Sequence, residues 1–446
     1  MPRLIAQMLA VLAAATVAVV PAPARDAPQI GAVRNVHIVD VQSGLVIRDQ
    51  TVVIADGKIR QIGPAQNVPI PFGAKVLDGD GGFLIPGLID THAHLWWDGD
   101  TLDEKPLRQF LQQGVTTIRH AGRGGRAALG IAAREAAAQD RFLSPRLVIS
   151  GMVNLRSVDR HAVTNPAALA ERLVELGVDG LKIREGLTIN DVREVIRIGR
   201  RTGIPVYGHT NDNGLSGRDY SLVAVEEGIA GLMHVPDLIS RPGGAPGDPA
   251  DWQAQWLWWR SIWDIMPQSE QDRLIESMVR RGAWLEPTLI TDHWIAYDAE
   301  HLAASERRGV LAEATEARQG FPTYSGADLE LYRRAYRNIE SFVRKFAEAG
   351  GTVLAGTDCV LVCGFIQDEL TLLVRAGLSP HQALRAATVD AAKALGRPDV
   401  GQVRVGYHAD MVLLRGNPLD DIRQTENIAA VLLGGILLSE ATDAAR

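Results

Sequence analysis

Short apolar runs and amphipathic segments alternate through the middle of the chain. The segments between the runs carry apolar residues at helical spacing, as residues 165–177 and 190–203 do. Strands that alternate with helices predict parallel β-α units, and eight such units predict a (β/α)8 barrel. We therefore expect an α/β protein with a TIM-barrel domain over residues 83–396. The eight candidate strands lie in residues 83–94, 114–122, 146–152, 180–183, 204–210, 229–235, 283–289 and 351–358.

Both ends of the chain have strand character instead. Residues 31–40 and 51–63 read as strands, and Asp56-Gly57 between two alternating runs is typical of a tight hairpin turn. Residues 408–418 and 429–440 have the same β character near the other end. We predict that residues 25–82 and 397–446 pair into one small β-sandwich domain beside the barrel.

Two regions are longer than a minimal barrel needs. Residues 251–266 hold five of the nine tryptophans, and residues 291–350 form a long helical stretch between strands seven and eight. A tryptophan cluster indicates core or interdomain packing, or else an aromatic wall or lid over a pocket.

The first 24 residues are typical of a secretory signal peptide. Arg3 supplies positive charge, residues 4–20 are apolar, and Ala22-Pro23-Ala24 offers a small-residue cleavage site. An uncleaved anchor is the alternative, although the apolar stretch is slightly shorter than the roughly 20 residues of a membrane span. We expect cleavage near Ala24, a secreted or periplasmic protein, and no stable membrane span after cleavage.

Composition narrows the function classes. The chain is 46% hydrophobic and 22% charged, which are globular values, and its formal net charge of −7 does not favour nucleic-acid binding. With only Cys359 and Cys363, the protein is not a disulfide scaffold. In an exported protein this pair is either joined or left as two thiols. The oligomeric state is open, and a homo-oligomer is one option.

Metal-competent or basic side chains end several of the apolar runs. In a strand, residues i and i+2 point to the same side, so His92 and His94 point together. At the carboxyl end of a barrel strand they face the site, where two imidazoles suit a divalent metal. One H-x-H pair is weak evidence, but single metal-competent or basic residues also end other apolar runs, and this recurrence favours a metal site. The further residues are Lys182, His209, His234 and Asp358.

Lys182 stands apart from the other five, because an ammonium group cannot bind a cation. A salt bridge is one role for this side chain. The other is carboxylation by carbon dioxide, which gives an anionic carboxylate able to bridge two metal ions. Burial in a barrel lowers the pKa of a lysine and favours the neutral, nucleophilic amine that carboxylation needs.

The order of these motifs resembles the amidohydrolase superfamily, and within it the imidazolonepropionase-like and Xaa-Pro dipeptidase (prolidase-like) members. The similar stretches span nearly the whole chain after its first residues. They are PGLIDTHAH (86–94), GVTTIR (114–119), GVDGLKI (177–183), GHT (208–210), EEGIAGLMH (226–234), AGTD (355–358), ELTLLVRAGLSPHQALRAAT (369–388) and GQVRVGYHADMVLLRGNPLDDI (401–422).

The resemblance implies two divalent metal ions, zinc by default, and carbon dioxide bound to Lys182 as a bridging carboxylate. It also implies a metal-bridging hydroxide that attacks an amide, with Asp358 as the catalytic residue that passes the proton to the leaving amine. The implied ligands are His92, His94 and Asp358 for one ion, His209 and His234 for the second, and Lys182 between them.

The sequence departs from the resemblance where substrate would bind. His120 follows Arg119, where many relatives carry an aspartate, and the third strand lacks a Gly-Gly-His-type ending. His120, His161 and Arg184 lie on loops expected to face the site, where they could bind a substrate carboxylate; a surface or supporting role is the alternative for each.

The leading interpretation is a metal-dependent amidohydrolase, a dipeptidase or carboxypeptidase-like enzyme on dipeptides with C-terminal proline or another apolar residue. Cyclic amides or N-acyl amino acids are the alternative substrates, as in imidazolonepropionase-like or aminoacylase-like members. A mononuclear, deaminase-like enzyme would leave Lys182 unmodified. A non-catalytic binding protein on the same fold is a further alternative, but it would be expected to have lost some of the six ligands.

Overall fold

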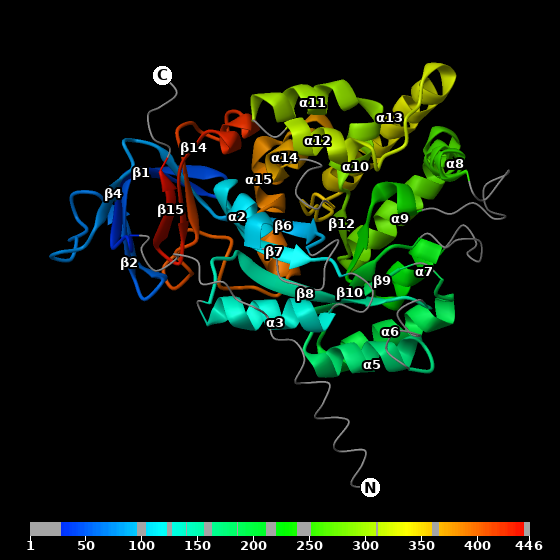
Figure 1. Ribbon diagram of the computed structural model, residues 1–446, viewed down its shortest axis with the longest axis horizontal. Helices are drawn as coiled ribbons and strands as arrows, with labels where there is room; N and C mark the ends of the chain where they lie inside the picture. Colours follow the sequence, from blue (N-terminus) through cyan, green and yellow to red (C-terminus); the bar gives the residue numbers. More distant parts are fainter. Residues whose placement is uncertain are drawn as a thin grey trace, which may run out of the picture.

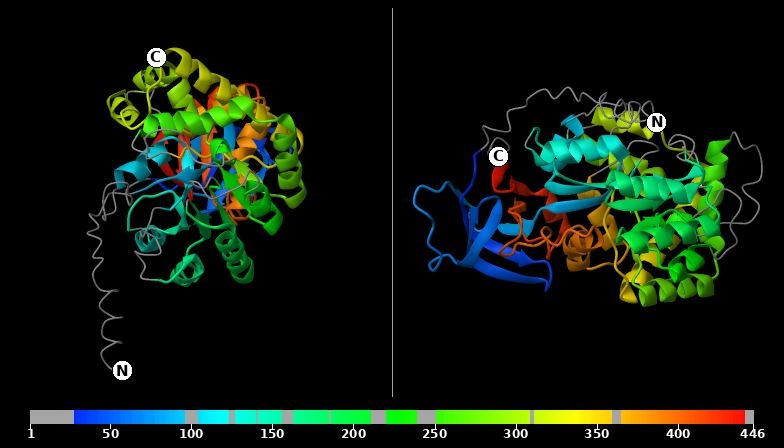
Figure 2. Two further views of the ribbon diagram at one scale, coloured as in Figure 1. Left: turned by 90° about the vertical axis from the view of Figure 1, so that its right-hand side faces the viewer. Right: turned by 90° about the horizontal axis from the view of Figure 1, so that it is seen from below.

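The computed structural model describes residues 28–95, 104–122, 127–139, 141–155, 163–184, 186–210, 220–238, 251–308, 311–358 and 365–440. Two bodies pack against each other (Figure 1): a barrel of parallel strands surrounded by helices, and a mixed sheet. The right-hand view in Figure 2 shows the strands from both chain ends side by side at one end of the molecule. The α/β fold class, a TIM-type barrel with a β domain from both termini, is therefore confirmed.

The barrel strands follow one another in chain order. They form a seven-stranded parallel sheet whose eighth position is taken by a short segment around Val353, which bridges to Leu285. Backbone bonds from Leu354 N to Leu285 O (2.8 Å) and from Thr91 N to Ala355 O (3.0 Å) join this segment to both neighbouring strands and close the barrel. The seven strands are β6 (Leu88–Ala93), β7 (Val115–His120), β8 (Arg146–Val153), β9 (Gly180–Ile183), β10 (Val206–Gly208), β11 (Gly231–Met233) and β12 (Trp284–Glu286).

The mixed sheet combines the two chain ends, as the β patterns predict. The expected hairpin is present, because Ala55 pairs with Lys58 and both turn residues, Asp56 (φ 53°) and Gly57 (φ 70°), are left-handed. The strands run in the order β15-β14-β13-β5-β1-β2-β3, with β4 beside β1. They are β1 (Ala32–Asp40), β2 (Leu45–Ala55), β3 (Lys58–Pro64), β4 (Val76–Asp78), β5 (Phe83–Pro86), β13 (Met411–Leu414), β14 (Ile428–Leu433) and β15 (Ile436–Glu440).

The reading of residues 83–94 as one barrel strand is wrong. The run is two strands: β5 pairs with β13 in the mixed sheet, and only β6 belongs to the barrel. Gly87 separates them, and a Cβ at this position would lie 2.0 Å from Thr116 Oγ1. The backbone can therefore pass from one sheet to the other only through a residue without a side chain.

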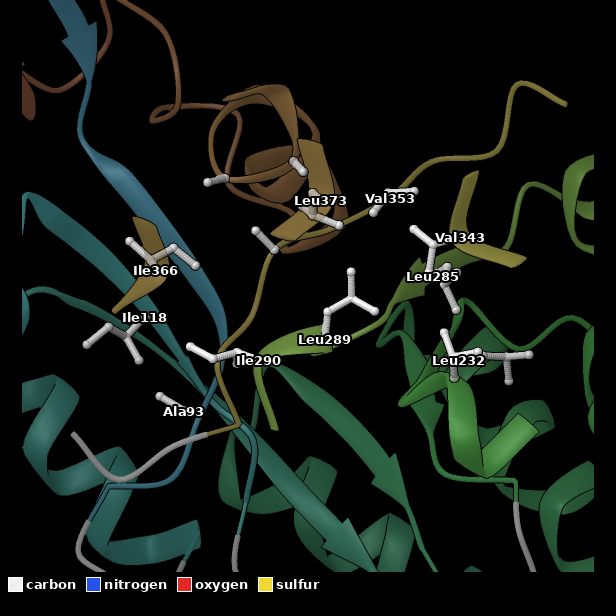
Figure 3. Close-up of a cluster of buried hydrophobic side chains, with 14 of the residues drawn as sticks. Ala93, Ile118, Leu232, Leu285, Leu289, Ile290, Val343, Val353, Ile366 and Leu373 are labelled. Atoms are coloured by element: carbon white, nitrogen blue, oxygen red, sulfur yellow. The ribbon is translucent and has the colours of Figure 1, made fainter. Parts of the chain in front are cut away.

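Helices cover the barrel and fill the long insertion, as expected. The barrel–helix layer is one large apolar cluster, part of which Figure 3 shows; β7 contributes Ile118, β11 Leu232, β12 Leu285 and the long helix α13 (Gly326–Glu348) Val343. The helices also include α8 (Trp252–Ile265), α10 (Leu289–Ala296) and α14 (Ile366–Arg375). Others are α2 (Glu104–Gln112), α3 (Ala127–Ala138), α5 (Pro166–Leu176), α6 (Ile189–Thr202), α7 (Tyr220–Glu227), α9 (Gln268–Arg281), α11 (Asp298–Arg307), α12 (Leu311–Arg318), α15 (Pro380–Ala386) and α16 (Val389–Ala394).

The tryptophan-rich segment is helix α8, and it packs on α13. Trp263 is buried and meets Phe342 edge to face with ring centroids 5.2 Å apart. The Trp256 ring lies 3.9 Å from the Arg260 guanidinium and donates its N–H to Tyr332 Oη at 3.2 Å. These contacts favour the packing interpretation of the segment over the lid.

An ion pair ties the barrel to the mixed sheet. Arg146, the first residue of β8, donates to both oxygens of Asp410 at 2.6 and 3.0 Å, and the Asp410 side chain is only 2% exposed. We expect Asp410→Asn to lower the free energy of unfolding by about 2–3 kcal/mol, somewhat less than for a fully buried pair because Arg146 is partly exposed. Urea unfolding measures this. Asp56→Asn, which changes an exposed carboxylate, is the control and should stay within about 0.5 kcal/mol; an equal effect of the two substitutions would contradict the prediction.

Candidate metal centre

The carboxyl ends of the barrel strands bring the six predicted ligand positions together. His92 lies on β6 and His94 directly follows it, and Lys182 lies on β9. The other three come immediately after β10, β11 and the eighth segment; they are His209, His234 and Asp358. Each side chain ends at the same edge of the barrel because parallel strands share one direction.

Asp358 is the centre of the group. Its Oδ1 lies 3.1 Å from His92 Nε2 and 3.0 Å from His94 Nε2, while Oδ2 lies 3.8 Å from His234 Nε2. The ligand atoms of His92, His234 and Asp358 all fall within 4.8 Å of one another, a spacing that could hold a metal ion. One carboxylate therefore faces three imidazoles from two different strands.

Lys182 and His209 complete the group. Lys182 Nζ lies 2.9 Å from His92 Nε2, and the ring of His209 lies against that of His234 with centroids 4.5 Å apart. Among the described residues, the buried Nε2 atoms of His209 and His234 have no hydrogen-bond partner. Buried polar atoms are nearly always satisfied, so these two nitrogens face a group that the described residues do not supply.

The four histidines are all held from behind by their Nδ1 atoms. Metal-binding histidines are usually oriented in this way, since a partner on one nitrogen fixes the ring and directs the other nitrogen at the metal. The Nδ1 partners are Glu286 Oε1 for His92 (2.6 Å), Gly122 O for His94 (3.0 Å), Asp237 Oδ2 for His209 (2.8 Å) and Thr288 Oγ1 for His234 (2.6 Å).

The contact between His94 and Asp358 tests whether a cation fits. A carbonyl oxygen only accepts hydrogen bonds, so the bond to Gly122 O places the proton of His94 on Nδ1. Burial lowers the pKa of His94 to about 4, so at neutral pH its Nε2 carries a lone pair that faces another acceptor, Asp358 Oδ1, at 3.0 Å. Ligand atoms that share one zinc ion stand about 3–3.5 Å apart. The donor set therefore fits a divalent metal.

Burial also changes the pKa of Lys182 and Asp358. It is the main cause that lowers the pKa of Lys182 to about 7; the charge of Asp358 opposes this shift and that of Arg184 adds to it. For Asp358, burial on its own raises the pKa, but the nearby His92 and His234 hold the pKa well below its usual value. The lysine can thus present a neutral amine near pH 7 while the carboxylate stays ionised.

Backbone strain gathers at this edge of the barrel. His234 (φ 57°), Thr288 (φ 48°) and Asp358 (φ 54°) are left-handed residues other than glycine, and each directly follows or closely follows a barrel segment. Such conformations cost about 1–3 kcal/mol each and persist where the surroundings enforce them, often at functional sites.

Sequence reasoning missed the groups behind the ligands. Glu286 lies inside the apolar run AWLEPTL, where a single carboxylate in a predicted strand gives no local indication of its partner. In the structure it is fully buried between His92 and Arg119. Burial raises the pKa of Glu286, but Arg119 and His92 together outweigh this effect, so that the pKa is lowered. The other missed supports are Thr288 and Asp237. The one available indication was that buried carboxylates are rare without a partner.

The predicted substrate residues are only partly placed. Arg184 follows β9 two residues after Lys182, and its backbone N–H donates to Val153 O at 3.1 Å. His120 ends β7, accepts the Leu95 N–H on Nδ1 at 3.1 Å, and has its ring 6.3 Å from that of His94. His161, Cys359 and Cys363 lie outside the described residues, as does the predicted signal peptide.

Known proteins match nearly the whole chain. The profile described as "Amidohydrolase family" matches residues 83–437. An imidazolonepropionase of Ectopseudomonas mendocina is 27% identical over 430 residues, covering 91% of this chain and 94% of that relative. An imidazolonepropionase of Symbiobacterium thermophilum is 27% identical over 399 residues, covering 84% and 85%.

Solved structures have the same fold at low sequence identity. A Xaa-Pro dipeptidase with bound methionine in the active site gives a TM-score of 0.66 at 19% identity and covers 92% of this chain and 99% of that one. Ochratoxinase from A. niger gives a TM-score of 0.64 at 18% identity, covering 94% and 99%. These neighbours support the fold, a barrel with an attached β domain.

Proposed function

The chain belongs to the amidohydrolase family, and we propose that it is a binuclear metal-dependent enzyme that cleaves amides. The family and the imidazolonepropionase relatives indicate a hydrolase of carbon–nitrogen bonds. The observation that carries the proposal is the set of four Nδ1-anchored histidines whose Nε2 atoms gather around Asp358 and Lys182. A non-catalytic protein on the same fold would be expected to have lost some of these residues.

The residues would divide the centre into two halves. His92, His94 and Asp358 would hold one ion, His209 and His234 the other, and Lys182, once carboxylated, would bridge them. When bound, two divalent ions, zinc by default for this ligand set, would supply an activated water and polarise the carbonyl of the substrate. Lys182 supports this assignment because burial lowers its pKa to about 7, which makes the neutral amine available to carbon dioxide.

Asp358 would move the proton during cleavage. Its Oδ1 lies 3.1 and 3.0 Å from the Nε2 atoms of His92 and His94, beside which it would bind the metal, whereas Oδ2 has His234 Nε2 as its neighbour at 3.8 Å. Oδ2 is therefore the oxygen that can accept a proton from the attacking water and deliver it to the leaving amine. The left-handed backbone at Asp358, φ 54°, fixes this orientation.

For the substrate we propose dipeptides with a C-terminal proline or another apolar residue. Arg184 supports a carboxylate-bearing substrate, because it directly follows β9, two residues beyond Lys182, and its charge acts on the Lys182 amine. His120 would add a hydrogen-bond donor: its Nδ1 accepts the Leu95 N–H, and burial lowers its pKa to about 3, so its single proton lies on Nε2. A cyclic amide or an N-acyl amino acid is the second candidate, and the imidazolonepropionase relatives favour the cyclic amide.

We further propose that the enzyme acts outside the cytoplasm, since residues 1–24 have the pattern of a cleaved signal peptide. No helix among the described residues is long and apolar enough to cross a membrane. Export would suit the scavenging of peptides or acylated amino acids.

Metal removal tests the centre. Chelation should abolish hydrolysis, and zinc with bicarbonate should restore it together with about two metal ions per chain. Bicarbonate should be required because Lys182 must be carboxylated before it can bridge. A single ion that binds equally well without bicarbonate would favour the mononuclear alternative. The measurements are metal analysis and turnover on a panel of dipeptides, N-acyl amino acids and cyclic amides; activity confined to cyclic amides would reject the dipeptidase proposal.

A further inference from the structure

We propose that the end of strand β12, residues 286–288, positions one histidine in each half of the metal centre without binding a metal itself. The inference rests on the proposed binuclear site. Its subject is a segment of three residues, Glu286-Pro287-Thr288, which we call the β12 turn. The turn meets His92 at its first residue and His234 at its last.

Glu286 fixes His92. Its Oε1 lies 2.6 Å from His92 Nδ1, its Oε2 accepts a hydrogen bond from Arg119, and all three side chains are fully buried. The Arg119 guanidinium is itself held, because it lies 4.3 Å from the centre of the Tyr207 ring and its Nε donates to Thr91 O at 2.5 Å. An ionised carboxylate only accepts, so His92 must carry a proton on Nδ1 and direct Nε2 toward Lys182 and Asp358.

Thr288 fixes His234 by the same logic. Its hydroxyl lies 2.8 Å from Pro287 O, which can only accept, and 2.6 Å from His234 Nδ1. Both contacts are satisfied together when the hydroxyl donates to the carbonyl and accepts from His234. This arrangement puts the His234 proton on Nδ1 and leaves a lone pair on the buried Nε2. The hydroxyl reaches this position because Thr288 is left-handed (φ 48°), a conformation that is costly for a β-branched residue.

Glu369 on α14 holds the strained turn in place. Its two carboxylate oxygens accept the backbone N–H groups of Leu289 and Ile290, at 3.0 and 2.8 Å, where α10 begins. These are the first N–H groups after Thr288, and they have no partner within the helix. The carboxylate is buried, so a rigid contact rather than solvent fixes the direction in which the chain leaves Thr288.

The β12 turn thus reaches across both halves of the proposed centre. His92 belongs to one half and His234 to the other, and their ring centroids are 4.8 Å apart. The turn contributes no ligand, yet it sets the tautomer and the orientation of both rings. Supporting groups of this kind change metal affinity about 10–100-fold when they are lost.

Stepwise metal titration tests the inference. Chelator-treated protein with bicarbonate is titrated with Co2+, whose absorption spectrum reports each ion as it binds, and a competing chelator gives both affinities. Glu286→Gln should weaken one of the two binding steps by about 10–100-fold, and Thr288→Val should weaken the other. Thr288→Ser, which keeps the hydroxyl, should restore the affinity of the wild type.

Two matched substitutions serve as controls. Thr425→Val removes another buried hydroxyl that donates to a backbone carbonyl, Ile422 O at 2.7 Å. Glu226→Gln changes a partly exposed carboxylate on helix α7 that also accepts a hydrogen bond from an arginine. Both should bind two ions with unchanged affinity. Glu286→Gln also leaves the Arg119 charge buried beside a neutral amide, and this loss of its ion pair can weaken metal binding by itself. A second measurement therefore uses the wild-type protein: nitrogen NMR with labelled histidine should show the protons of the His92 and His234 rings on Nδ1.

The outcomes separate the two proposals. A wild type that binds only one ion overturns the binuclear centre itself. Two ions in the wild type, with both variants unchanged or with both weakening the same step, overturn the role of the β12 turn alone. A proton found on Nε2 of either histidine in the metal-free protein overturns it as well.

Discussion

Asp358→Asn is expected to reduce turnover by at least about 10³-fold while the metal content stays near that of the wild type. The amide oxygen of asparagine can still face His92 and His94, the groups that lie 3.1 and 3.0 Å from Oδ1. The amide nitrogen that replaces the other oxygen cannot take a proton at neutral pH. General acid–base groups contribute about 10²–10⁴-fold, so the loss should appear in kcat rather than in metal binding.

The same substitution at Asp410 is the matched control. Asp410 is a buried carboxylate that pairs with Arg146 at the amino-terminal end of a barrel strand, far from the proposed centre. Asp410→Asn should lower stability and leave kcat unchanged. Turnover by Asp358→Asn at a rate within tenfold of the wild type would exclude Asp358 as the group that moves the proton.

Lys182→Ala is expected to lower the affinity for metal by more than the 10–100-fold that follows loss of a supporting group. The substitution removes the side chain that would become the bridging carboxylate. It also leaves a space beside His92 Nε2, which lies 2.9 Å from Lys182 Nζ. A short carboxylic acid such as acetate should enter that space and partly restore both metal and turnover. Metal analysis and kinetics with and without acetate measure the effect.

Two further variants serve as controls, one at residue 182 itself and one on a helix outside the site. Lys182→Met keeps the length of the side chain and cannot be carboxylated, so it should lose metal without rescue by acetate. Lys393→Ala, on helix α16, should behave like the wild type. Unchanged metal content in Lys182→Ala would exclude the bridging role.

The sequence was sufficient to predict the barrel and its ligand edge. Alternation of apolar runs and amphipathic segments specifies β-α units, and parallel strands place all their carboxyl ends at one edge. A residue that ends such a run, as His209 or His234 does, can therefore be assigned to the site without knowledge of any long-range contact. The two residues of H-x-H are a local property as well, since strand periodicity alone places His92 and His94 on one side.

The tertiary structure alone decided what stands behind the ligands and where the chain changes sheets. His92 and Glu286 are 194 residues apart in sequence, and they meet only because the barrel closes through the segment around Val353. The change of sheet at Gly87 depends on the close approach of Thr116, which no local pattern records. Periodicity describes the direction of a side chain within its own element, whereas a hydrogen-bond partner or a steric contact depends on a second element whose position is set by packing.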